Sequence, residues 1–267
     1  MTKFIQFTII FILIPVLARS QSVIGTKEYK KIFEEYGVSG CFILYDLNDN
    51  IKLIYNPSRC DSGFIPASTF KIPHALIALE TGAVKGKDFK IKWDGVKRSV
   101  ESWNKDHTLE SAIQNSVVWY FQETAKIIGK STFVEWLNKL DYGNKDVSGN
   151  DPFWLRGNLR ITPNEQLEFM YKFYNELLPF SKKNVDIVKD AILIEEGKNY
   201  KIHAKTGWAQ NVKDIGWLTG YLEAGGNVYL FVTSVESKFG NDKFIQSRIK
   251  ISKSILADYT GINFNEK

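Results

Sequence analysis

Hydrophobic residues recur along this chain with two different periods. Between residues 26 and 37, apolar side chains follow a helical period, which predicts an amphipathic helix. The stretch "CFILYDLNDNIKLIY", residues 41–55, predicts a β-hairpin that turns at residues 47–50. From Lys201 onward the period becomes two. Three strands are therefore expected, followed by a helix that ends at Gly261; the four segments are 201–210, 215–223, 227–235 and 242–259.

The middle of the chain, from Leu109 to about Ile194, is dominated by helical patterns. One helix start is well marked, because Thr162, Pro163 and Glu165 supply an N-cap, a first-turn proline and the acid of a capping box. Strands at both ends with helices between them predict an α+β fold. We expect an antiparallel sheet formed by the N- and C-terminal segments, flanked by helices with a helical lobe, and a site at the join.

Composition is that of an ordinary globular protein. The 267 residues are 44% hydrophobic and 24% charged, enough for one large domain or two small ones. The net charge of +5 is spread without a block of like charges, so nothing indicates nucleic-acid binding. Anionic small molecules are the only ligands that this charge favours, and the oligomeric state is open.

The first residues are typical of a secretory signal peptide. Lys3 precedes an apolar run, residues 4–17, and Ala18-Arg19-Ser20 has the small-x-small form of a cleavage site. The run is shorter than the ~18 apolar residues of a membrane-spanning helix. We therefore expect residues 1–20 to be removed and residues 21–267 to form the exported mature domain, with no membrane association after cleavage.

Two cysteines, Cys41 and Cys60, flank the predicted hairpin. An oxidising compartment permits a disulfide between them. Cys60 overshoots the hairpin partner of Cys41 by several residues, however, so a disulfide and two buried free thiols are both open.

Several kinds of catalytic chemistry have no support in the sequence. The three histidines, His74, His107 and His203, never form an HxH or HxxxH pair, so a zinc hydrolase is not indicated and no metal is expected. No G-x-S-x-G motif is present, which argues against a serine nucleophile with a histidine base.

A serine and a lysine at helical spacing offer another route to covalent catalysis. S-x-x-K occurs at Ser68/Lys71, at Ser102/Lys105 and at Ser247/Lys250. Ser102 lies in a polar turn, and Ser247 is expected on the terminal helix among exposed charges. Only Ser68 opens an apolar helix, on which positions i and i+3 share a face and the lysine would be desolvated. A neutral amine beside a serine is a base beside a nucleophile.

A second signal is "AKTGWA", which places Lys205, Thr206 and Gly207 on a predicted strand. The cation and the hydroxyl can bind a carboxylate, and the glycine lets a ligand approach the backbone. S-x-x-K and K-T-G together mark penicillin-binding proteins and active-site serine β-lactamases. These enzymes carry a third element, a further serine, for which the segments 116–118, 102–104 and 148–150 are candidates.

The complete set of motifs resembles the class D β-lactamases, the oxacillinases. From about Gly40 to Leu256 the chain contains, in the family's order, S-T-F-K, S-x-V, Y-G-N, W-x-x-G and K-T-G. The resemblance implies an antiparallel sheet flanked by helices and hydrolysis of the β-lactam ring of penicillins and related antibiotics in the periplasm. It implies small-molecule substrates and no cofactor other than CO2 or bicarbonate.

The resemblance also assigns roles by position. Ser68 corresponds to the nucleophile and Lys71 to the general base, which the family carboxylates on its side-chain nitrogen. Ser116 would relay the proton to the leaving nitrogen, Val118 would dry the lysine pocket, and Trp154 would donate its indole N–H to the carbamate. The backbone N–H of Trp208 would complete the oxyanion hole. The residues that would bind the substrate are Lys205, Thr206, Gly207, Trp208 and Arg248. Tyr142 is expected only to support the site.

Three other functions share part of this pattern. A penicillin-binding transpeptidase would use S-x-N, which residues 102–104 or 148–150 could supply, but the chain leaves no room for a pedestal or anchor. A class A β-lactamase needs a deacylating glutamate, and "EWLN" at 135–138 matches that motif poorly. The sensor domain of a β-lactam receptor carries S-T-F-K and is acylated without useful turnover; it would follow membrane helices, whereas here we expect only a cleavable signal.

Overall fold

The computed structural model describes residues 21–24, 27–210 and 213–264. The expected signal peptide, residues 1–20, lies outside the described residues. The helices are α1 Lys27–Glu35, α2 Pro57–Cys60, α3 Lys71–Glu80, α4 Leu109–Gln114, α5 Val118–Ile128, α6 Lys130–Leu140, α7 Phe153–Arg156, α8 Pro163–Tyr174, α9 Lys182–Ala191 and α10 Phe244–Thr260, with short 3-10 turns at Ala67–Phe70 and Glu101–Trp103. The strands are β1 Gln21–Ile24, β2 Ser39–Asp46, β3 Ile51–Tyr55, β4 Lys90–Ile91, β5 His107–Thr108, β6 Leu193–Gly197, β7 Tyr200–Gln210, β8 Asp214–Ala224 and β9 Asn227–Ser237.

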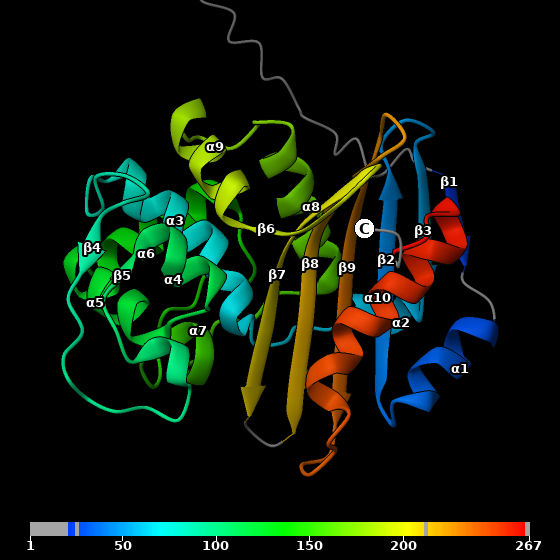
Figure 1. The fold of residues 1–267 in the computed structure, drawn as a ribbon, viewed down its shortest axis with the longest axis horizontal. Helices are drawn as coiled ribbons and strands as arrows, with labels where there is room; N and C mark the ends of the chain where they lie inside the picture. Colours follow the sequence, from blue (N-terminus) through cyan, green and yellow to red (C-terminus); the bar gives the residue numbers. More distant parts are fainter. Residues whose placement is uncertain (1–20, 25–26, 211–212, 265–267) are drawn as a thin grey trace, which may run out of the picture.

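The main sheet joins the two ends of the chain, as the sequence predicts (Figure 1). Its described strands follow the order β1-β3-β2-β9-β8-β7-β6. The N-terminal hairpin is linked to the C-terminal meander through the antiparallel pairing of β2 with β9. All pairings are antiparallel except that of β1 with β3, which is parallel and which the sequence did not predict.

Alternate residues of β2 face two hydrophobic cores, which is the expected consequence of the two-residue period of a strand. Cys41, Ile43 and Tyr45 lie in the larger core, shared with the helical lobe. Phe42 and Leu44 lie in the smaller core, under α1 and α10. The sheet is therefore the middle of three layers, with α1 and α10 on one face and α8 and the lobe on the other (Figure 1).

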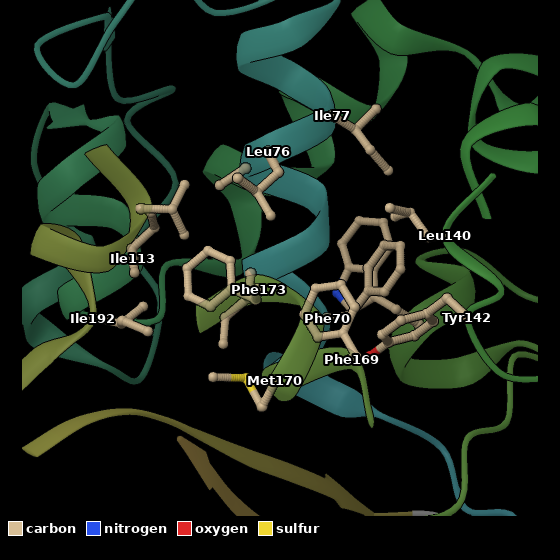
Figure 2. Packing of buried hydrophobic residues seen from close by; sticks show 14 of the residues in the cluster. Phe70, Leu76, Ile77, Ile113, Leu140, Tyr142, Phe169, Met170, Phe173 and Ile192 are labelled. Atoms are coloured by element: carbon tan, nitrogen blue, oxygen red, sulfur yellow. The ribbon is translucent and has the colours of Figure 1, made fainter. Parts of the chain in front are cut away.

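The larger core fixes the helix that carries the S-T-F-K motif. Every residue from Lys71 to Leu79 is buried, so α3 runs through the centre of the lobe. Figure 2 shows Phe70, Leu76 and Ile77 among side chains from other segments, including Tyr142 from the turn after α6 and Phe169 from α8. Because Lys71 lies in the first turn of this buried helix, its side chain is removed from water.

Local signals at two helix ends are confirmed. Thr162 accepts a hydrogen bond from the Glu165 N–H, and the Glu165 carboxylate accepts one from the Thr162 N–H, which completes the capping box of α8. Gly261 ends α10 in the left-handed conformation that glycine adopts at low cost.

Cys41 and Cys60 are free, buried thiols. This is one of the two states that the sequence left open. The neighbouring Cys60 thiol and burial raise the pKa of Cys41 well above its usual range, so the thiol stays protonated.

Two expectations need correction. The helical pattern was extended to about Ile194, but Leu193–Gly197 is strand β6, because it pairs with β7 at the edge of the sheet. Ser247 was expected among exposed charges; it is fully buried on α10, and its hydroxyl donates to the Phe244 carbonyl. Within the described residues, no helix is long and apolar enough to cross a membrane.

Candidate active site

The S-T-F-K motif begins in a tight turn that leads into α3. Ala67 has a φ of 50°, a left-handed conformation that costs free energy for any residue other than glycine. The 3-10 turn Ala67–Phe70 then passes directly into α3. Ser68 and Lys71 thus lie on one face, and Lys71 Nζ is 2.8 Å from Ser68 Oγ. The contact predicted from the i, i+3 spacing is present.

Burial favours the neutral amine form of Lys71. Its side chain is 1% exposed, and burial lowers its pKa well below the usual value; the positive charge of Lys205 lowers it further. A neutral amine has a free lone pair, so in that form the Ser68 hydroxyl can donate its hydrogen to Nζ. The pair has the geometry of a nucleophile with its base.

Aromatic and uncharged side chains surround Lys71. Its Nζ lies 5.2 Å from the centre of the Phe121 ring. Trp154, on α7, is buried, stacks on Phe70 at 5.8 Å and meets the edge of His74 at 5.2 Å. Burial lowers the pKa of His74 well below its usual value, so this ring carries no charge at neutral pH. In the described part of the chain, the Trp154 indole N–H has no hydrogen-bond acceptor, so one donor in this apolar wall is available.

Two buried cations, Lys205 and Arg248, lack acidic partners. Lys205 is 5% exposed, and burial, followed by the charge of Arg248, lowers its pKa to about 7. Arg248 extends from α10, donates from Nη1 to the Gly207 carbonyl at 2.8 Å and has a pKa lowered by burial to about 10. Among the described residues neither side chain forms an ion pair, and Arg248 Nε has no partner. Two neighbouring buried cations without a counter-ion can bind a carboxylate, and that role remains a prediction.

Gly207 allows β7 to lie against the nucleophile turn. A Cβ at this position would stand 3.0 Å from the Pro66 carbonyl oxygen and 3.2 Å from the Thr69 methyl group. Such distances are too short for a comfortable contact, so any larger residue would push the strand away from Ser68. The K-T-G glycine is thus explained by a close approach of two backbones.

The edge of β7 is open where it passes Ser68. The strand β6 pairs with β7 only from Tyr200 to His203, and the Ala204 N–H donates to the Ile192 carbonyl. Successive peptide N–H groups point to opposite sides of a strand, so the Trp208 N–H points to the same side as that of Ala204. Beyond β6, the strand β7 contacts the turn that carries Ser68. The Trp208 N–H therefore lies on the edge of β7 that β6 leaves unpaired.

Ser116 lies at the junction of α4 and α5 in a strained conformation. Its φ is 55°, and the preceding Asn115 carbonyl accepts a hydrogen bond from the Trp103 indole at 2.9 Å. The helix α5 begins at Val118, packs on α3 and carries Phe121 to Lys71. The structure thus brings S-x-V to the helix that contacts the lysine. The proton relay by Ser116 remains a prediction.

Comparison with known proteins agrees with this geometry. The family described as "Penicillin binding protein transpeptidase domain" matches residues 40–259. The probable β-lactamase YbxI of Bacillus subtilis is 43% identical over 198 residues, 74% of each chain. β-Lactamase OXA-48 of Klebsiella pneumoniae is 41% identical over 212 residues, 79% of this chain and 80% of that one. A solved class D β-lactamase from Sebaldella termitidis has a TM-score of 0.86 and 33% identity, and the match covers 91% of this chain and 100% of that one.

The chain belongs to the class D β-lactamase family. The same fold occurs in the C-terminal domain of the Bacillus licheniformis BlaR penicillin-receptor. That domain matches with a TM-score of 0.84 and 32% identity, and the match covers 92% of this chain and 99% of that domain. Architecture alone therefore does not separate a class D hydrolase from a sensor of the same fold.

The other two S-x-x-K pairs lack the class D geometry. Ser247 is buried, but its partner Lys250 is exposed. Lys105 is also exposed, beside the 3-10 turn that contains Ser102. Neither Lys105 nor Lys250 is removed from water. Of the three S-x-x-K pairs, Ser68/Lys71 is therefore the one with a buried lysine. In the described residues, no three His, Cys, Asp or Glu side chains are grouped so as to hold a metal ion.

His74 is a buried packing residue next to Lys71, a place that the sequence analysis did not assign to it. It is fully buried three positions after Lys71 and contacts Phe121, Phe133 and Trp154. Its Nε2 hydrogen-bonds Thr124 Oγ1 at 3.0 Å. The i, i+3 spacing from Lys71 could have indicated that it borders the same pocket.

Proposed function

We propose that this chain hydrolyses the β-lactam ring of penicillins and related antibiotics through a covalent acyl-enzyme on Ser68. The observation that carries the proposal is the buried Lys71 amine 2.8 Å from Ser68 Oγ, with a pKa that burial lowers well below its usual value. Membership of the class D family supports the same reaction. We further propose that the mature domain acts in the periplasm after loss of residues 1–20, in line with the signal pattern of the sequence.

Acylation would begin with transfer of the Ser68 proton to Lys71. Ser68 Oγ then attacks the lactam carbonyl carbon, and the oxyanion that forms is held by the N–H groups of Ser68 and Trp208. The ring C–N bond breaks, and the leaving nitrogen takes a proton delivered through Ser116. Lys205 and Arg248 bind the substrate carboxylate throughout, which orients the carbonyl above Ser68.

The surroundings of Lys71 fit carboxylation by CO2. Only an unprotonated amine reacts with CO2, and burial favours the unprotonated form of Lys71. The available indole N–H of Trp154 supplies a donor for the product, and Val118 is half-buried at the start of the adjacent α5. Once present on Lys71, the carbamate provides an anionic base for both acylation and deacylation.

A β-lactam sensor is the second candidate, because the BlaR receptor domain has the same fold. Such a domain is acylated but does not release the product. Counting nitrocefin turnovers per enzyme separates the two functions. We expect many turnovers per molecule; a single stoichiometric burst followed by a stable acyl-enzyme would favour the sensor.

A further inference from the structure

The Y-G-N motif has no role in the reaction described above, yet its tyrosine is fixed with unusual rigidity. Gly143 has a φ of 53°, and a Cβ there would lie 2.1 Å from the Arg160 carbonyl oxygen. The Asn144 N–H donates to the same carbonyl. Only glycine permits this contact, which holds the turn against the segment after α7. Tyr142 is 1% exposed and points toward Phe70 (Figure 2).

Tyr142 belongs to a buried hydrogen-bond cluster that ends beside the nucleophile. Gln166, on α8, donates from Nε2 to Thr69 Oγ1 at 2.9 Å and to the Tyr142 hydroxyl at 3.4 Å. The Tyr142 hydroxyl also lies beside Thr69. Thr69 gives its only hydroxyl hydrogen to the Pro66 carbonyl at 2.7 Å, so it accepts from Gln166. Gln166 therefore links the Thr69 hydroxyl to the Tyr142 hydroxyl.

Thr69 also separates the nucleophile turn from β7. A Cβ on Gly207 would meet the Pro66 carbonyl oxygen at 3.0 Å, and the Thr69 methyl group and the Trp217 Cβ at 3.2 Å each. The same residue that Gln166 and Tyr142 hold is therefore the spacer between the Ser68 turn and the peptide that joins Gly207 to Trp208. A shift of Thr69 would change the distance between the two N–H groups of the oxyanion hole.

We propose that Gln166 and Tyr142 are positioning residues that set the width of the oxyanion hole by clamping Thr69 between the Y-G-N turn and β7. The inference rests on the proposed function, because it concerns the acylation step at Ser68. The strained φ of Ala67 explains why a clamp is needed: without external contacts this turn would relax toward a more favourable backbone. Burial raises the pKa of Tyr142 far above its usual value, so the phenol stays neutral and acts by hydrogen bonding.

The test compares Tyr142→Phe and Gln166→Leu with the wild type. Tyr29→Phe is the matched control, because it removes a hydroxyl that hydrogen-bonds Asp258 on the far face of the sheet. We expect Tyr142→Phe and Gln166→Leu each to slow single-turnover acylation roughly tenfold with little change in the dissociation constant of the non-covalent complex. The double variant should lose little more than the worse single variant, because both residues act on Thr69.

Infrared spectroscopy of the acyl-enzyme gives a readout that a merely structural role would not move. A slowly hydrolysed β-lactam with a ¹³C-labelled ring carbonyl is used to acylate each variant. We expect the acyl carbonyl band to move to higher wavenumber in Tyr142→Phe and Gln166→Leu, since weaker hydrogen bonds polarise the carbonyl less, and to stay at the wild-type position in Tyr29→Phe.

Lower thermal stability in the two variants with unchanged acylation and an unmoved carbonyl band would overturn the inference. A wild type that forms no acyl-enzyme would refute the proposed function itself, and with it the inference. Acylated wild type with unaffected variants would refute the inference alone.

Discussion

At the residue scale, burial lowers the pKa values of two lysines. The pKa of Lys71 falls well below its usual value because its amine is buried beside Phe121, and Lys205 has a pKa of about 7 because it is buried next to Arg248. The proposed roles of the two lysines require opposite charge states. An unmodified Lys71 must be neutral to accept the Ser68 proton or to react with CO2, whereas Lys205 would bind a carboxylate best when charged.

These states predict a bell-shaped dependence of kcat/KM on pH. On the acid side, activity falls as Lys71 becomes protonated and can no longer act as a base. On the alkaline side, activity falls as pH rises through about 7, where free Lys205 loses its charge and carboxylate binding weakens. Steady-state kinetics on Lys205→Arg provide the check, because a guanidinium stays charged. The alkaline limb should move to higher pH; an unmoved limb would mean that another group titrates there.

Removal of Arg248 should weaken binding of carboxylate-bearing substrates. Charge-assisted hydrogen bonds contribute ~1.5 to 3 kcal/mol each, so Arg248→Ala should lower kcat/KM by roughly one to two decades. Lys250→Ala is the control on the same helix, since that lysine is exposed. Equal kinetics for wild type and Arg248→Ala would show that the arginine does not bind substrate.

Carboxylation of Lys71 predicts a requirement for CO2. Activity should decline in acidic buffer depleted of CO2 and return when bicarbonate is added, and Trp154→Ala should need more bicarbonate for the same recovery. Lys71→Ala, if acylated, should remain trapped as the acyl-enzyme. A wild type indifferent to bicarbonate after thorough CO2 removal at low pH would contradict carboxylation but leave Ser68 as the nucleophile.

At the scale of elements, the site is the contact between one turn and one strand edge. The turn Ala67–Phe70 contacts β7, and Gly207 makes the close approach possible. We expect the separation of these two elements, rather than either alone, to determine where the oxyanion is held.

Gly207→Ala tests this contact. The added methyl would meet the Pro66 carbonyl oxygen at 3.0 Å, so the strand must move away from Ser68. We expect acylation to slow at least about tenfold, as small displacements of reacting groups do. Gly63→Ala is the matched control, because a Cβ there meets only the Arg160 side chain, at 3.4 Å. A wild-type acylation rate in Gly207→Ala would show that the close approach of β7 to the Ser68 turn does not control acylation.

At the scale of the whole molecule, local signals predicted most elements, and long-range pairing decided the rest. The hairpin β2–β3, the meander β7–β9 and the capped helix α8 follow from periodicity and turn chemistry within short windows. The strand β6 was missed because "LIEEG" has no strand signature of its own and forms a strand only by pairing with β7. Burial of Ser247 was missed for a similar reason, since α10 lies on the sheet with that face inward.

In the candidate site, too, contacts between residues close in sequence were predictable and contacts between distant segments were not. Ser68 and Lys71 are predictable because one helical turn brings them together. Their pairing with Lys205, Arg248 and Trp154 depends on the fold, and the sequence indicated it only through the resemblance to a family. The cluster of Thr69, Tyr142 and Gln166 could not have been found from sequence spacing, because three separate segments meet there.

Mass spectrometry of the intact protein after a penicillin pulse tests the central claim most directly. The wild type should gain the mass of the whole drug, and a digest should place that mass on the peptide that contains Ser68. The protein should then return to its original mass as substrate is consumed, because hydrolysis regenerates the free serine. An adduct on the peptide of Ser102 or Ser247, or no adduct in Lys71→Ala and wild type alike, would contradict the account.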